Sequence, residues 1–268
     1  MSSAIIDGGT LEKVIGIVRE ASRLMVKSGY RVMEKDGLAN LVTSSDLAVQ
    51  DFLTEKLSQL IPGSGFICEE EDFRDTSKEL IWIIDPIDGT ANYARGISDC
   101  CISVALADSE GPLLGVVYSP AREELYSALR GQGAFLNGKS IHVSDRPFAN
   151  GLLCCAMSTY RKEFAKTCSD IIYDIHMRAN DTRRWGSAAL ELCFLASGVV
   201  ELYFEMRLQP WDYAAGELVL TEAGGSIASF DGKAPSLYNP SMVVAANCRE
   251  SLDELLSTVH RHMDRLPY

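Results

Sequence analysis

Sequence patterns that would mark a membrane or secreted protein are missing from this chain of 268 residues. No apolar run approaches the ~20 residues that are needed to cross a bilayer. The first seven residues lack the positive region and apolar core of a signal peptide. None of the eight cysteines forms a C-x-x-C pair, and Cys100-Cys101 and Cys154-Cys155 are neighbours inside apolar runs. We therefore expect a cytoplasmic protein with no membrane association and with cysteines that act as small buried residues. A redox or zinc role is the alternative.

Nucleotide-binding loops are also missing. The chain contains neither GxxxxGK[ST] nor GxGxxG, and Gly131-Gln132-Gly133 is a lone G-x-G between predicted strands. Basic residues are scarce, 25 against 37 acidic ones, and the net charge of −12 disfavours a nucleic-acid partner. The small basic cluster at 178–184 is typical of solvated surface. These absences argue against an ATP, NAD or nucleic-acid site.

What remains is the composition of a globular protein, with 47% hydrophobic residues. Apolar periodicity predicts helices over 10–27, 44–60, 161–177, 187–196, 212–223 and 250–262, the second capped by Ser44 or Ser45. Strands are predicted at 65–68, 80–84, 101–107, 113–118, 124–128, 134–136, 152–156, 199–204, 227–228 and 242–246.

The order of these elements predicts an α/β protein in two parts. Residues 1–147 form an N-terminal α+β subdomain, and residues 148–268 form a C-terminal subdomain in which strands and helices alternate. Together they are expected to make one compact unit. The polar segment 30–40 is expected to be a mobile loop or a loose hairpin.

The stretch from Trp82 to Tyr93 carries the strongest chemical signal. Its apolar strand is predicted to end at Asp85-Pro86, because proline lacks a backbone donor. Asp85 and Asp88 then face one small volume, where a hard divalent cation would relieve their repulsion. Gly89 and Thr90 offer backbone N–H groups at the start of a short helix, which favours an anion.

Other acids stand at comparable places along the chain. Glu69 is the first of four successive acids and follows a predicted strand, so it could share a metal site with Asp85. Asp212 opens a helix, and Glu205 lies seven residues earlier, just past a strand. Asp46 falls in a first helical turn, where complementarity to the helix dipole explains it equally well.

Three motifs together resemble the inositol monophosphatase family: Glu69-Glu70, then Asp85-Pro86-Ile87-Asp88-Gly89-Thr90-Ala91-Asn92-Tyr93, then Trp211-Asp212-Tyr213-Ala214-Ala215-Gly216 through Gly224-Gly225. They occur in the family's order, and the resemblance spans roughly Leu11 to Asn247. It implies an αβαβα five-layer sandwich of the inositol monophosphatase and fructose-1,6-bisphosphatase type. It also implies Mg²⁺-dependent hydrolysis of a phosphate monoester by in-line attack of an activated water.

The resemblance assigns roles by motif position. Metal ligands would be Glu69, Asp85, the carbonyl of Ile87, Asp88 and Asp212, for two or three Mg²⁺ ions. Asp46 and Thr90, with Glu69, would be catalytic. Substrate would meet Asp88, Gly89, Thr90, Gly186, Ser187, Ala188, Glu205 and Asp212. Lys35 would lie on a mobile loop over the metals.

This chemistry agrees with the residues available. The four histidines lie outside every motif, and no motif supplies an activated Ser or Cys nucleophile. One departure is Cys68, which stands where the family usually has glycine. It puts the close backbone approach there in doubt, and its thiol could make activity sensitive to oxidants.

The default substrate is myo-inositol 1-phosphate, and the resemblance further implies lithium sensitivity and a homodimer. Thr90-Ala91-Asn92-Tyr93 fits the inositol type better than the nucleotidase type. Fructose 1,6-bisphosphate, a nucleotide 3′-phosphate or histidinol phosphate are alternatives, since fold alone does not decide specificity. A different class of function is a regulatory binding protein of the same fold, acting on transcription machinery or RNA.

Overall fold

The computed structural model describes residues 6–25, 32–34, 41–70, 74–157 and 161–263. Its α-helices are α1 (Gly8–Ala21), α2 (Ser44–Leu60), α3 (Thr90–Tyr93), α4 (Ala165–His176), α5 (Ala188–Ala196), α6 (Pro210–Glu222) and α7 (Arg249–His260). Short 3-10 helices cover Ser22–Leu24, Phe148–Asn150 and Lys162–Phe164. No helix within these ranges is long and apolar enough to span a membrane.

Within the residues that the structure describes, the strands form three sheets. A small hairpin pairs β1 (Val32–Glu34) with β2 (Leu41–Thr43). The large sheet contains β3 (Gly65–Cys68), β4 (Arg74–Asp75), β5 (Ile81–Asp88), β6 (Cys101–Asp108), β7 (Gly111–Ser119), β8 (Glu124–Leu129), β9 (Ala134–Leu136) and β10 (Lys139–Ile141). The third sheet contains β11 (Leu152–Cys155), β12 (Asp181–Arg183), β13 (Leu202–Leu208), β14 (Ser226–Ala228) and β15 (Ser241–Ala246).

The order of strands in the large sheet is β10-β9-β8-β7-β6-β5-β3-β4, and only β3 and β5 run parallel. The order in the other sheet is β12-β11-β13-β15-β14, with β11 parallel to both of its neighbours. The chain completes the eight-stranded sheet at residue 141 before it begins the five-stranded sheet at residue 152. The proposed division into subdomains at residue 147 stays a prediction.

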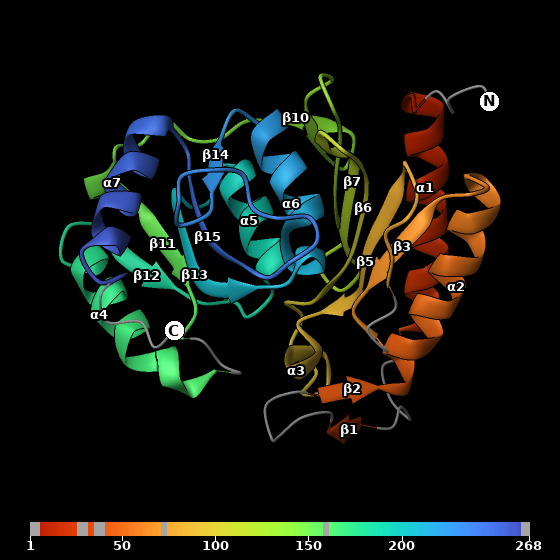
Figure 1. Ribbon diagram of the computed structural model, residues 1–268, viewed down its shortest axis with the longest axis horizontal. Coiled ribbons are helices and arrows are strands. Elements are labelled where there is room, and N and C mark those ends of the chain that lie inside the picture. The colour runs from red at the N-terminus through yellow and green to blue at the C-terminus, as the bar shows by residue number, and fades with distance from the viewer. Residues whose placement is uncertain (1–5, 26–31, 35–40, 71–73, 158–160, 264–268) are drawn as a thin grey trace.

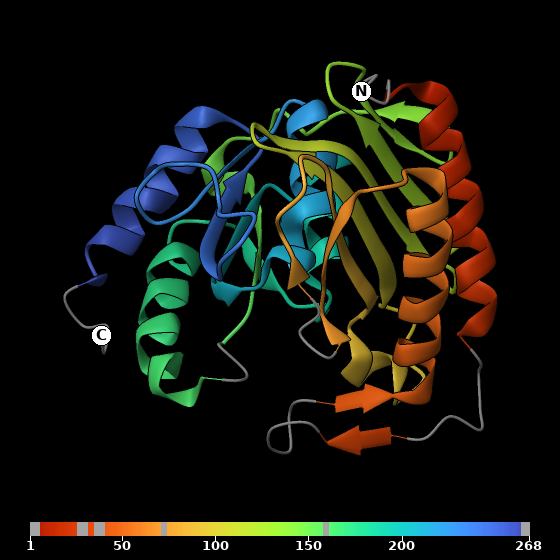
Figure 2. The same cartoon turned by 45° about the vertical axis from the view of Figure 1, so that its right-hand side comes forward.

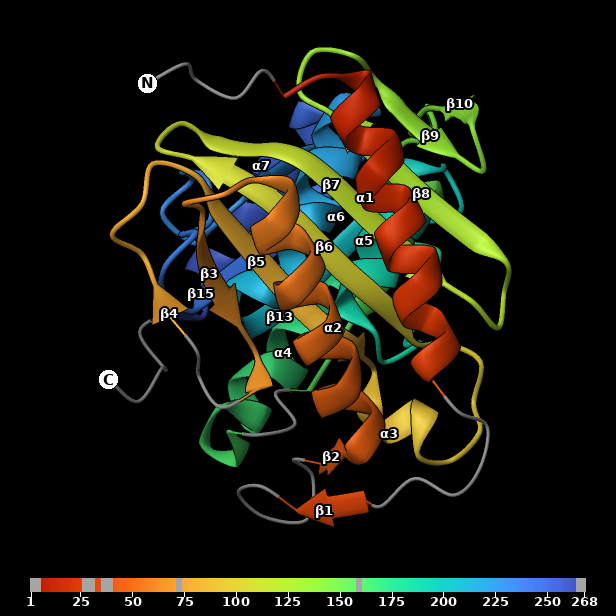
Figure 3. The same ribbon diagram turned by 90° about the vertical axis from the view of Figure 1, so that its right-hand side faces the viewer.

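Helices and sheets alternate in five layers (Figure 1). α1 and α2 cover one face of the large sheet (Figure 3), α5 and α6 lie between the two sheets, and α4 and α7 cover the outer face of the five-stranded sheet. The αβαβα sandwich expected from the sequence is therefore confirmed. The β1–β2 hairpin and α3 lie together at one end of the large sheet (Figure 2).

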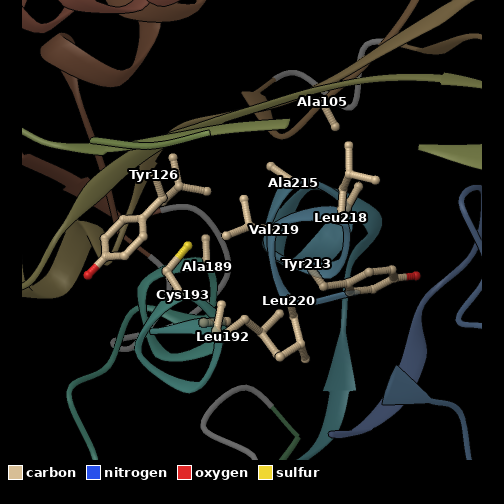
Figure 4. Packing of buried hydrophobic residues seen from close by; sticks show 14 of the residues in the cluster. Ala105, Tyr126, Ala189, Leu192, Cys193, Tyr213, Ala215, Leu218, Val219 and Leu220 are labelled. Carbon is tan, nitrogen blue, oxygen red and sulfur yellow. The ribbon is translucent and has the colours of Figure 1, made fainter. Parts of the chain in front are cut away.

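Strand β5 shows why this layering requires an apolar run. Trp82 and Ile84 point into the core beneath α1 and α2, whereas Ile81 and Ile83 point into the core with α5 and α6. Both faces of the sheet are covered by helices, so the side chains on both faces of β5 are buried. The strand therefore has an unbroken apolar run instead of an alternation of apolar and polar residues. Figure 4 shows α5 and α6 side by side in the central core.

Helix α6 lies very close to the large sheet. A Cβ atom built on Gly115 of β7 would stand 2.8 Å from the backbone oxygen of Ala215. A Cβ atom built on Gly216 of α6 would likewise stand 2.9 Å from the Cβ atom of Leu192 in α5. Glycine at these positions lets the central helices contact their neighbours at a distance that a side chain would prevent.

The prediction that β5 ends at Pro86 is wrong. The strand continues to Asp88, and its register against β6 shifts between the pairs Asp85–Ser103 and Asp88–Cys101. Pro86 lies inside this irregularity, where the missing N–H costs no ladder hydrogen bond. The bulge therefore carries the chain past the proline.

Three other predictions need correction. α1 ends at Ala21 instead of extending to residue 27, because the Ser22 hydroxyl donates to the carbonyl of Arg19 and a 3-10 turn follows. α2 is capped by Thr43 instead of Ser44 or Ser45. Seven cysteines are buried as expected, but Cys248 is exposed and its sulfur accepts from the N–H of Ser251 at the start of α7.

Candidate active site

Two neighbouring strands of the large sheet, β3 and β5, place acids next to each other. β3 and β5 are parallel with Cys68 opposite Ile84, so the next residues, Glu69 and Asp85, lie side by side. The N–H of Glu69 donates to the carbonyl of Ile84 at 3.2 Å. The expected proximity of Glu69 and Asp85 is confirmed, but Asp85 lies within β5 and not at its end.

Asp85 lies at the centre of a group of carboxylates. Its side chain is 2% exposed, and its Oδ1 has no hydrogen-bond partner. Burial raises the pKa of Asp85 well above its usual value, and the charges of Glu69, Asp88 and Asp212 raise it further. The electrostatic potential at this point is therefore strongly negative.

Asp88 and Asp212 are each held by backbone donors. The Oδ2 of Asp88 accepts the Ser187 hydroxyl and the N–H of Ala189, both at 2.7 Å. The Oδ2 of Asp212 accepts the N–H of Gln209 at 2.7 Å at the start of α6. Burial is the main cause that raises the pKa of Asp88 to about 6 and the pKa of Asp212 well above its usual value.

Thr90 and Asp46 meet across the site. The Thr90 hydroxyl lies 3.2 Å from Oδ1 of Asp46 and 3.0 Å from the carbonyl of Ile87. Asp46 is fully buried, and its Oδ2 accepts both the N–H and the hydroxyl of Thr43, forming a capping box. Burial raises the pKa of Asp46, while its hydrogen bonds to Thr43 and Thr90 oppose that shift. Asp46 therefore caps α2 and also contacts Thr90, while its catalytic role stays a prediction.

The segment after Asp88 has the backbone of an anion site. Gly89 has φ +88° and precedes the single turn of α3, so the N–H groups of the first turn point out of the helix. A Cβ on Gly89 would stand 2.9 Å from the carbonyl of Asp99. Only glycine accommodates both this φ and this contact.

Residues of the second half lie on the other side of Asp88. Gly186 is exposed and has φ +82°, while Ser187 and Ala188 are buried at the N-terminus of α5. Glu205 of β13 accepts the hydroxyl of Tyr203 at 2.9 Å. Burial raises the pKa of Glu205 to about 7, and the charge of Asp88 contributes to that shift. The segment 186–188 and Glu205, which are expected from the sequence to contact the substrate, thus lie next to the group of acids around Asp85.

The donor set suits a hard divalent cation. Buried carboxylates that repel one another, with one oxygen unpartnered, are stabilised by an ion that accepts oxygen ligands. Within the described ranges, no three His, Cys, Asp or Glu side chains already converge as ligands. The carboxylates instead turn to other partners: Glu69 hydrogen-bonds Asp85, and Asp88 and Asp212 accept backbone N–H groups.

Two site predictions have separate outcomes. Lys35 lies outside the described residues. Cys68 is fully buried, and burial raises the pKa of its thiol to about 12, so the reactive thiolate form is suppressed. The oxidant sensitivity considered for Cys68 stays a prediction.

Three polar residues around the site were given no role from the sequence. Gln50 exchanges two hydrogen bonds with the backbone of Glu70, directly after Glu69. Asn92 donates to the carbonyls of Asp99 and Trp185. Glu191 accepts the N–H groups of Trp185 and Gly186. Glu191 had a visible signal, since it is the one polar residue in an otherwise apolar helix.

The fold and this site define the class of protein, a layered α/β phosphomonoesterase of the hydrolase class. The model of the inositol monophosphatase family matches residues 4–264, so the chain belongs to that family.

Individual relatives agree with this membership. The chain is 35% identical over 253 residues to inositol monophosphatase 1 of Solanum lycopersicum, covering 89% of this chain and 91% of the relative. It is 33% identical over 262 residues to the Nus factor SuhB of Escherichia coli strain K12, covering 92% and 98%. Among solved structures, the Thermotoga maritima IMPase has a TM-score of 0.84 and 28% identity, with coverage of 97% and 100%.

Proposed function

We propose that the chain is a Mg²⁺-dependent phosphatase whose substrate is an inositol monophosphate, with myo-inositol 1-phosphate as the first choice. The observation that carries the proposal is the group of mutually repelling carboxylates around Asp85, beside the N–H groups that follow Gly89. A cation site and an anion site adjoin, as a phosphate monoester bound through divalent cations requires.

The residues that would hold the ions are those that match the motifs of the inositol monophosphatase family. Glu69, Asp85 and the carbonyl of Ile87 would hold one Mg²⁺, and Asp85, Asp88 and Asp212 a second. A weaker third would lie near Glu69. Such ions, when bound, act as Lewis acids that stabilise charge on the attacking and leaving oxygens.

The protein's own groups would supply binding and orientation. The N–H groups of Gly89 and Thr90 would bind phosphate oxygens. Because the Thr90 hydroxyl can donate to Asp46, its oxygen is left to accept a hydrogen bond from the attacking water and to orient it. Glu205 and the 186–188 segment would contact the alcohol side of the substrate.

A phosphate-release assay tests this proposal. Purified protein is given inositol monophosphates, fructose 1,6-bisphosphate, a nucleotide 3′-phosphate and histidinol phosphate, with Mg²⁺ or with excess EDTA. We expect release from an inositol monophosphate that EDTA abolishes, that Mg²⁺ restores and that Li⁺ inhibits. Faster release from another compound would correct the substrate, and release insensitive to EDTA would contradict the metal role.

A binding role in transcription is the second candidate, favoured by the 33% identity to a Nus factor. The retained carboxylates and the net charge of −12 argue against it as the main function. No phosphate release from any member of the panel would favour the binding role. We further propose that the protein is cytoplasmic and that it forms a homodimer. Size-exclusion chromatography with light scattering tests the oligomeric state.

A further inference from the structure

Glu191 is a buried acid that the proposed mechanism does not use. It lies in α5, is 2% exposed, and every other residue of that helix is apolar. Its Oε1 accepts the N–H of Trp185 at 2.6 Å and the N–H of Gly186 at 2.9 Å. The side chain thus reaches back past the start of its own helix and binds the two residues before Ser187.

The start of α5 explains why this matters. Ser187 is the N-cap residue, but its hydroxyl does not cap the helix; it donates to Asp88 instead. The N–H of Ala189 donates to the same oxygen of Asp88. The orientation of Asp88 therefore depends on where the turn 185–187 places these two donors.

The same turn is held from the opposite side. The Asn92 amide donates to the carbonyl of Trp185 at 2.6 Å and to that of Asp99 at 2.7 Å. A Cβ on Gly89 would stand 3.3 Å from the carbonyl oxygen of Gly186. The turn is therefore fixed between the segment that follows Asp88 and the carboxylate of Glu191.

We propose that Glu191 is a positioning residue, whose carboxyl group holds the 185–187 turn so that Ser187 and Ala189 orient Asp88 for metal and substrate binding. The inference rests on the proposed function, since Asp88 is a metal ligand only there. Residues that orient a metal ligand typically contribute about 10–100-fold to metal affinity or activity.

The decisive variant is Glu191→Leu, which removes the acceptor and keeps similar bulk. Calorimetric titration of the substrate-free protein with Mg²⁺ should give a Kd about 10–100-fold higher than that of the wild type. KM for inositol monophosphate should rise, while kcat at saturating Mg²⁺ and substrate recovers much of its value. Glu191→Gln, which retains an acceptor oxygen, should restore both Kd and KM.

Glu217→Leu is the matched control. Glu217 is also a buried glutamate of a central helix, 8% exposed, and no hydrogen bond ties it to the 185–187 turn. Its replacement should leave the Mg²⁺ Kd and KM unchanged. If Glu217→Leu raises them as much as Glu191→Leu does, the effect is a general one of the helical layer and the inference is overturned.

The outcomes separate the two proposals. A wild type that binds no Mg²⁺ and releases no phosphate overturns the proposed function, and the role of Glu191 with it. A wild type that does both, with unchanged Kd and KM in Glu191→Leu, overturns the role of Glu191 alone. If Glu191→Leu does not fold, Glu191→Asp decides, because its shorter carboxylate withdraws from both N–H groups; wild-type Kd and KM in that variant would refute the inference.

Discussion

Asp88 connects the two halves of the molecule through one carboxylate oxygen. That oxygen accepts donors about a hundred positions later in the chain, from Ser187 and Ala189. Its other oxygen remains for the metal in the proposed function. A single residue thereby links the end of β5 to the start of α5, and its orientation depends on both.

Replacing Asp88 by asparagine should abolish turnover and leave the fold nearly intact. Asparagine has almost the same volume but lacks the charge that a divalent cation requires, so kcat/KM should fall by more than about 100-fold. Steady-state kinetics measure the loss, and circular dichroism and Tm report the fold. Asp231→Asn, in an exposed turn, is the control and should keep full activity. Wild-type activity in Asp88→Asn would refute the site.

At the scale of elements, α2 and α6 both position an acid at the site through the same kind of helix capping. Each helix carries an aspartate at its third position, and that side chain binds the backbone N–H of the residue that precedes the helix. In α2 the hydroxyl of Thr43 adds a further donor to Asp46. Capping therefore orients Asp46 and Asp212 while it stabilises the helix ends.

Thr43→Val tests the capping of α2. Valine keeps the size and branching of threonine but lacks the hydroxyl, so the free energy of unfolding should fall by about 1–2 kcal/mol. Because Asp46 loses one of its donors, kcat should fall as well. Urea unfolding and kinetics measure the two effects, and Thr43→Ser, which keeps the hydroxyl, should behave as the wild type does. A stable and fully active Thr43→Val protein would contradict this account.

Glu217 of α6 makes the free energy of unfolding depend on pH. Burial raises its pKa from 4.5 to about 8, and its Oε2 has no hydrogen-bond partner. Between these values the unfolded chain has released the proton that the folded protein still holds, so stability falls as pH rises from about 4.5 to about 8.

Glu217→Gln should remove this dependence on pH, because glutamine does not ionise. The variant should gain stability relative to the wild type by up to about 1.4 kcal/mol per pH unit within that window. Urea unfolding of both proteins at pH 5 and at pH 8 measures the difference. An equal difference at both pH values would show that Glu217 does not hold its proton in the folded state.

At the scale of the whole molecule, the site depends on how closely the layers approach one another. Asp46, Asp85 and Asp212 come from a covering helix, from the large sheet and from the central helical layer. The contact between Gly115 and Ala215 sets the spacing between the last two of these layers. A change of that spacing would displace Asp212 relative to Asp85.

Gly115→Val tests this spacing. Its side chain would meet the backbone of α6, so the free energy of unfolding should fall by about 1–3 kcal/mol or more, and the Mg²⁺ requirement should rise. Gly16→Ala is the control: Gly16 lies in α1, with no atom within 4 Å of a Cβ built there. Alanine there should stabilise the helix by about 0.5–1 kcal/mol. Unchanged stability in Gly115→Val, measured by urea unfolding, would contradict the close approach.

The sequence by itself predicted most of the helices and strands, and its family resemblance predicted the five layers and the acids of the site. Periodic apolar residues closely predicted five of the seven α-helices that lie in the described ranges, and the resemblance to the inositol monophosphatase family brought Glu69, Asp85, Asp88 and Asp212 forward as one group. These features are local: strand and helix patterns, and residues at strand ends, depend on covalent neighbours and on burial.

Only the tertiary structure decided which groups hold these acids in place. The continuation of β5 past Pro86, the two hydrogen bonds of Gln50, and the fixing of the 185–187 turn by Asn92 and Glu191 have no local signature. Each is a hydrogen-bond or register choice made when layers dock, because a buried polar group takes whichever partner the packing brings within reach.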